Sequence, residues 1–128
     1  MPQQALSSCT IRLDSASLDD AAAFWRSTLG YQEVSRTADT TPMERRTLQS
    51  DSYPELAIEL ISCRPRPTIG STLGSLRSLC FKVSDPVATA RQALHALWTQ
   101  PIDPTEPPPD TVMLIDPSGY RVELVRAS

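Results

Sequence analysis

The sequence repeats one pattern of segments at about half its length, and this duplication limits the folds open to the chain. Residues 58–61 read Ile-Glu-Leu-Ile and residues 122–125 read Val-Glu-Leu-Val, 64 positions later. Residues 11–13 (Ile-Arg-Leu) and 81–83 (Phe-Lys-Val) form a second matching pair at a similar spacing. Two copies of one supersecondary unit must pack on each other to bury their apolar faces.

The first copy is predicted to consist of a strand, a helix and three further strands. Residues 8–15 alternate apolar and polar side chains, as a half-buried strand does. Ser17 is expected to cap a helix that ends at Gly30 and carries Phe24 and Trp25 into the core. The three strands that follow are expected at residues 31–37, 45–50 and 56–61.

The second copy is predicted to follow the same order. A strand over 78–83 leads to Asp85-Pro86, an N-cap followed by proline at the first helical position. An amphipathic helix is expected over 86–98, with its apolar stripe on Val87, Ala90, Leu94 and Leu97. Proline-rich residues weaken any strand near 101–105. The remaining elements are a strand over 111–115, a turn over 116–119 and a strand over 120–125.

A single domain accommodates both copies. The chain has 128 residues, which is an ordinary length for one domain. We expect an α+β fold in which module 1 covers about residues 6–66 and module 2 about residues 75–127. Residues 64–74 contain two Pro and two Gly and are the best linker candidate.

The charge and apolar composition exclude several classes of protein. The formal net charge is −3, so no basic excess is available to neutralise nucleic-acid phosphates. No apolar run approaches the length of a membrane span, and residues 1–4 show no secretion signal. We expect a cytoplasmic protein with neither a nucleic-acid nor a membrane partner.

The counts of cysteine and histidine restrict the chemistry further. Cys9, Cys63 and Cys80 are too few for a disulfide framework and are expected to be buried, reduced thiols. His95 is the only histidine and falls beside the apolar stripe of its helix. A metal site built on imidazoles, or a catalytic centre that needs a histidine base, is therefore not expected.

The chain resembles the vicinal oxygen chelate superfamily, also called the glyoxalase/bleomycin-resistance/dioxygenase superfamily. The segment Leu13-Asp14-Ser15-Ala16 through Phe24-Trp25 to Leu29-Gly30-Tyr31 is similar to the opening of its glyoxalase-like branch. The segment 116–124, Asp-Pro-Ser-Gly-Tyr-Arg-Val-Glu-Leu, is similar to the superfamily's ending, Asp-Pro-x-Gly-x-x-x-Glu-Leu. The resemblance implies two βαβββ modules that form a curled mixed sheet around one cavity.

The resemblance also assigns positions to the metal ligands of metal-dependent relatives. One ligand comes from the first strand and one from the last strand of each module, and the matching residues are Thr10, Glu59, Ser78 and Glu123. Neutral hydroxyls are feeble ligands, and only Glu59 and Glu123 could hold a cation firmly. We expect no cofactor, or at most a weakly bound Mg or Mn on these two carboxylates.

Strand alternation places further charges in the expected cavity. Glu59 and Glu123 each lie between apolar neighbours, so their side chains point to the opposite sheet face. The same alternation sends Arg12 and Lys82 there, and charges inside a concavity should be paired. We predict that Arg12 and Lys82 lie within salt-bridge reach of Glu59 or Glu123. The alternative is a set of separate, water-exposed charges.

Three functions remain open on this basis. The first is a protein that binds a small molecule in the cavity without a catalytic metal, as sequestering members of the superfamily do. The second is a metal-dependent lyase, isomerase or dioxygenase, with Glu59 as a weak candidate for the general base and Glu123 as a ligand. The third is a non-catalytic regulatory module. The resemblance also implies a homodimer, with possible exchange of modules through the linker.

Overall fold

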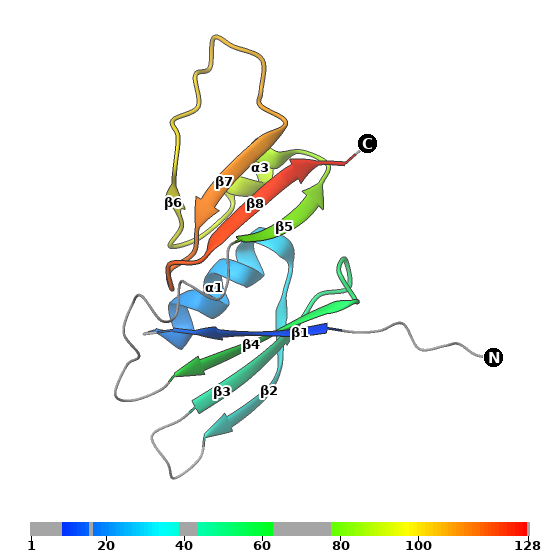
Figure 1. Ribbon diagram of the computed structural model, residues 1–128, viewed down its shortest axis with the longest axis vertical. Helices are drawn as coiled ribbons and strands as arrows, with labels where there is room; N and C mark the ends of the chain where they lie inside the picture. The colour runs from blue at the N-terminus through cyan, green and yellow to red at the C-terminus, as the bar shows by residue number, and fades with distance from the viewer. Residues whose placement is uncertain (1–8, 16, 39–43, 63–77, 128) are drawn as a thin grey trace, which may run out of the picture.

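The computed structural model describes residues 9–15, 17–38, 44–62 and 78–127. Two four-stranded sheets lie at opposite ends of the molecule, with the long helix α1 between them (Figure 1). The elements in chain order are β1 (Cys9–Asp14), α1 (Leu18–Leu29), β2 (Gln32–Ala38), β3 (Glu44–Gln49), β4 (Leu56–Ser62), β5 (Ser78–Val83), α3 (Pro86–Arg91), β6 (Leu97–Trp98), β7 (Thr111–Ile115) and β8 (Arg121–Arg126).

The two sheets have the same topology, which confirms the duplicated βαβββ unit. The strand orders are β1-β4-β3-β2 and β5-β8-β7-β6. In each sheet the first strand pairs in parallel with the last strand of its module, and every other pair is antiparallel. Strands β4 and β8, which carry the repeated Glu-Leu pattern, are therefore equivalent.

Helix α1 has both ends that the sequence predicts. The Ser17 side chain accepts a hydrogen bond from the backbone N–H of Asp20 at 3.3 Å. Gly30 ends the helix with a φ of 73°, in the left-handed region that glycine tolerates best. The buried face of α1 includes Phe24 and Trp25, both fully buried, as predicted.

Aromatic side chains join the two modules in one core. Trp25 of α1 packs edge-on against Phe81 of β5, with ring centroids 5.8 Å apart. Tyr53, in the turn before β4, contacts Phe81 at 5.1 Å and donates its hydroxyl proton to the Lys82 carbonyl at 2.7 Å. The modules thus share a hydrophobic core and form one folded unit.

The buried carboxylate of Asp116 lies in the turn that joins β7 to β8. Its Oδ1 atom accepts hydrogen bonds from the backbone N–H groups of Ser118 and Tyr120, at 3.0 and 2.8 Å. The Tyr120 hydroxyl in turn accepts a hydrogen bond from the backbone N–H of Asp14 at 3.3 Å. The turn therefore connects module 2 to the end of β1.

The second helix is shorter than the sequence predicts. The expected helix over 86–98 is wrong beyond Arg91, and Leu97–Trp98 form the short strand β6. His95 adopts a left-handed φ of 62°, and the backbone N–H of Leu94 bonds to the Ser27 hydroxyl at 2.9 Å instead of continuing the helix. This contact with α1 overrides the helical pattern, and Leu94 and Leu97 are exposed. No strand forms within 99–110, the loop that extends beyond β6 and β7 (Figure 1).

The expected burial of the cysteines is wrong for two of them. Cys9 and Cys80 are free and exposed, because Cys9 lies at the start of β1 and Cys80 lies on the open face of β5. Cys63 and the proposed linker at 64–74 lie outside the described residues. Within the part of the chain that the structure describes, no helix is long and apolar enough to cross a membrane.

Candidate functional site

The open face of the first sheet carries three of the predicted site residues. Leu13 of β1 and Ile58 and Leu60 of β4 are fully buried in the core. Strand alternation therefore places Thr10, Arg12 and Glu59 on the opposite face. Thr10 and Arg12 are exposed, whereas Glu59 is partly buried.

Arg12 and Glu59 form the ion pair that the sequence predicts. They are direct neighbours in the parallel register of β1 and β4, and Arg12 Nε lies 2.8 Å from Glu59 Oε1. The Arg12 side chain is 70% exposed and the Glu59 side chain 16%. Glu59 Oε1 is buried, yet within the described chain it accepts no hydrogen bond of good geometry. The contact is therefore an ion pair, whose arginine is largely in water.

The second sheet does not repeat this pair. Cys80, not Lys82, is the register neighbour of Glu123, and Lys82 lies opposite Val125. Neither Lys82 nor Glu123 forms a salt bridge with any described residue, so this part of the prediction is wrong. The reason is a slip of two residues in the alignment of the repeats: the register makes Cys80 the counterpart of Arg12 and Lys82 the counterpart of Asp14.

In module 2, the thiol of Cys80 and the carboxylate of Glu123 occupy the positions equivalent to those of Arg12 and Glu59 in module 1. Partial desolvation by its surroundings and, after it, the negative charge of Glu123 raise the pKa of the Cys80 thiol, although the residue as a whole is exposed. A raised pKa keeps the thiol protonated and unreactive at neutral pH. The two half-sites thus differ in charge: one pairs a cation with a carboxylate, and the other pairs a neutral thiol with a carboxylate.

The four positions that resemble metal-ligand positions do not fit a transition metal. Thr10 and Glu59 lie on the first sheet, and Ser78 and Glu123 on the second. Two of the four donors are neutral hydroxyls, and Arg12 competes for the charge of Glu59. Across the described ranges, no three His, Cys, Asp or Glu side chains gather closely enough to hold a metal ion.

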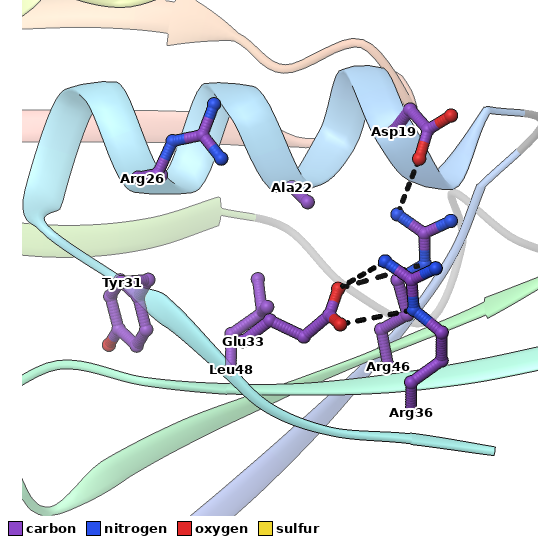
Figure 2. Close-up of a pocket in the computed structure, with 8 residues that line it drawn as sticks. All are labelled: Asp19, Ala22, Arg26, Tyr31, Glu33, Arg36, Arg46 and Leu48. Carbon is purple, nitrogen blue, oxygen red and sulfur yellow. Dashed lines mark hydrogen bonds and ion pairs between the residues drawn. The ribbon is translucent and has the colours of Figure 1, made fainter.

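A cavity that the sequence analysis missed lies on the other face of the first sheet. We call it the α1 pocket, because it lies between α1 and strands β2 and β3 (Figure 2). Its volume is about 290 Å³. It is lined by Asp19, Ala22, Arg26, Tyr31, Glu33, Arg36, Arg46 and Leu48.

A network of ion pairs closes one end of the α1 pocket. The Arg46 side chain is 9% exposed and lies 2.6 Å from Asp19 Oδ1 and 3.3 Å from Glu44 Oε2. Glu33 receives two hydrogen bonds from Arg36, at 3.0 and 3.2 Å. The hydrogen bond and charge of Arg46 lower the pKa of the Asp19 carboxyl. The signal in the sequence was Arg46 itself, which alternates in phase with buried Leu48 and so belongs on the covered face.

Solved structures share the fold of this chain. TnmS3, an antibiotic binding protein from Streptomyces sp. CB03234, aligns with a TM-score of 0.64 and 17% identity over 100% of this chain and 99% of its own. The fosfomycin resistance protein FosX from Listeria monocytogenes, complexed with Mn(II) and sulfate, aligns with a TM-score of 0.65 and 14% identity over 99% and 95%. A glyoxalase I mutant from Zea mays aligns with a TM-score of 0.67 and 16% identity over 92% of this chain but 45% of its own.

No protein-family model matches the sequence, and no curated protein matches it significantly. The structural neighbours are glyoxalase, bleomycin-resistance and fosfomycin-resistance proteins, so the chain has the vicinal oxygen chelate fold. Because the identities are low, the likeness establishes the fold and not an activity.

Proposed function

We propose that this chain is a member of the vicinal oxygen chelate superfamily that binds a small molecule without a catalytic metal. The ligand would lie against the open sheet faces that carry Arg12, Glu59 and Glu123, where the resemblance implies a cavity between the two βαβββ modules. We further propose that the protein works in the cytoplasm as a homodimer.

The Arg12–Glu59 pair is the observation that carries this proposal. A divalent metal at this site would need the full charge of Glu59, and a guanidinium lies 2.8 Å from that carboxylate. The remaining positions, Thr10 and Ser78, offer only hydroxyls. The site therefore favours recognition through hydrogen bonds and charge over Lewis-acid chemistry. TnmS3, which matches this chain over its full length, is described as an antibiotic binding protein.

A metal-dependent lyase, isomerase or dioxygenase is the alternative. It is favoured by one observation: the buried Glu59 Oε1 is held only by its ion pair with a largely exposed arginine and accepts no hydrogen bond of good geometry from any described group. Such a carboxylate remains available to act as a base or a ligand if Arg12 swings away. In that function Glu59 would be the general base and Glu123 a metal ligand. A regulatory module without a ligand is the third possibility.

A thermal-shift screen of the full chain separates these functions, because only a ligand that binds the native state raises the melting midpoint. The screen should contain divalent cations and hydrophobic antibiotics of several aromatic classes. We expect at least one organic compound to raise the midpoint, and Glu59→Gln and Glu123→Gln to weaken that effect.

Glu106→Gln, in the exposed loop before β7, is the matched control and should leave the effect unchanged. A specific shift with Mn or Zn that both site variants abolish would favour the enzyme. The absence of any shift across the screen would favour the regulatory module.

A further inference from the structure

Two of the three arginines that line the α1 pocket are paired with carboxylates, and the third, Arg26, has no such partner in the described chain. Arg36 and Arg46 are held by Glu33, Asp19 and Glu44 at one end of the pocket. Arg26 extends from α1 at the other end, and Figure 2 shows the Glu33 carboxylate turned away from it, toward Arg36 and Arg46. Arg26 is exposed and forms no salt bridge with any residue that the structure describes.

The middle of the α1 pocket is apolar and owes its space to a small side chain. Ala22 lies on α1 between Asp19 and Arg26, and Leu48 of β3 lies below it (Figure 2). Tyr31, near Arg26, donates its hydroxyl proton to the Leu56 carbonyl at 3.0 Å, so this proton is already in use. The pocket therefore offers one unpaired guanidinium beside a small apolar patch, formed by the half-buried Ala22 with Leu48, which is only 1% exposed, beneath it.

We propose that the α1 pocket binds a small organic monocarboxylate, whose carboxylate pairs with Arg26 and whose apolar body lies against Ala22 and Leu48. A guanidinium binds a carboxylate in a planar, bidentate geometry. The single unpaired cation selects a single negative charge, and the Ala22–Leu48 surface selects an apolar group over a second charged one.

This site is separate from the one in the proposed function. Thr47 pairs in register with Glu59, so its neighbours Arg46 and Leu48 point to the opposite face of the first sheet. The two sites can therefore be tested, and can fail, independently.

Benzoate is the probe, and benzamide is its uncharged counterpart of nearly the same shape. Both are titrated into the ¹⁵N-labelled full chain while amide resonances are followed by NMR. We expect benzoate to shift the amides of Ala22, Arg26 and Glu33 with a dissociation constant of about 1 mM, a strength that a ligand this small can reach. Benzamide should bind at least about fivefold more weakly, because it lacks the charge that pairs with Arg26.

Two variants test the charge and the space separately. Arg26→Gln should weaken benzoate by about fivefold and leave benzamide unchanged. Ala22→Leu fills the pocket and should weaken both, whereas Ala23→Leu is the control, since Ala23 is equally half-buried on α1 and does not line the pocket.

Equal binding of benzoate and benzamide would overturn the proposal. So would benzoate binding that survives Arg26→Gln or Ala22→Leu unchanged, or benzoate shifts confined to the residues around Glu59.

Discussion

Asp116 provides a direct test of how the turn between β7 and β8 is stabilised. Its side chain is 2% exposed. Burial raises the pKa of this carboxyl from its ordinary 3.8 to about 6, although the backbone N–H groups of Tyr120, Ser118 and Gly119 and the indole of Trp25 lower it in part. Trp25 Nε1 and Asp116 Oδ2 are both buried, and neither completes a hydrogen bond of good geometry within the described chain. The indole therefore offsets little of the cost of burying the charge.

Because folding raises the pKa of Asp116, this carboxyl makes the folded protein less stable as the pH rises. Well below pH 3.8 the carboxyl is protonated in both the folded and the unfolded state, and its contribution to stability is complete. As the pH rises, the unfolded chain releases this proton first, and the contribution is lost as the pH passes about 6. At about 1.4 kcal/mol for each pKa unit, the loss is about 3 kcal/mol.

Asp116→Asn removes the titration and keeps an oxygen that can accept the bonds of Ser118 and Tyr120. The free energy of unfolding of both proteins is measured by urea denaturation, followed by far-UV circular dichroism, at several values between about pH 4 and pH 7. The difference in the free energy of unfolding between wild type and variant should change by about 2 kcal/mol over this range, with the wild type losing stability relative to the variant. The substitution can also change the free energy of unfolding by an amount that does not depend on pH, and the change with pH is independent of that amount.

Asp51→Asn, in an exposed turn, controls for the loss of one surface carboxylate. If the free energies of unfolding of wild type and Asp116→Asn changed in parallel with pH, the reasoning would be refuted, because the buried carboxyl would then titrate alike in the folded and the unfolded state.

Four further predictions concern the site, the helix cap and the assembly. The coupling energy between Arg12→Met and Glu59→Gln in a double-mutant cycle should be about 0–1 kcal/mol, because Arg12 is 70% exposed; about 3 kcal/mol would show a desolvated pair. Gly30→Ala should cost about 1–2 kcal/mol in chemical denaturation, since the new Cβ meets only Ser50 Oγ at 3.9 Å and the cost comes from the φ of 73°; an unchanged stability would contradict this. Elemental analysis after dialysis should find no stoichiometric zinc, iron or nickel, and finding one would move the metal-dependent enzyme to first place. Light scattering at micromolar concentration should show a dimer, and a particle of 14.1 kDa would reject it.

The sequence predicted the elements whose patterns are set locally. The alternation in β1, the cap at Ser17 and the glycine after Leu29 each have a local physical cause, and all three are confirmed. The repeated Glu-Leu pattern predicted that β4 and β8 are equivalent strands, and the pairing confirms it.

The failures lie where distant contacts decide the structure. The hydrogen bond from Leu94 to Ser27 of α1 accompanies the early end of α3, and no pattern within 86–98 reveals that partner. The salt bridge of Arg12 was predicted because charges inside a concavity should be paired, and the parallel register of β1 and β4 places Arg12 beside Glu59. The predicted salt bridge of Lys82 is absent among the described residues. The comparison of the two copies was two residues out of register, which leaves Lys82 on the expected sheet face but makes Val125, and not Glu123, its neighbour.

The candidate site was predictable only in part. The open-face residues Thr10, Arg12 and Glu59 follow from alternation along single strands. The α1 pocket depends on a gap between Ala22 and the strands that arises from the packing of a helix on two strands, and periodicity does not report the size of such gaps.

The aromatic contact between Trp25 and Phe81 has a consequence for how the two halves can be separated. Each ring comes from a different copy of the repeat, and both are almost completely shielded from water. A chain cleaved between residues 62 and 78 would leave each fragment with an uncovered aromatic surface. Such fragments would be insoluble alone and would regain structure on mixing, so the pair behaves as a fragment-complementation system.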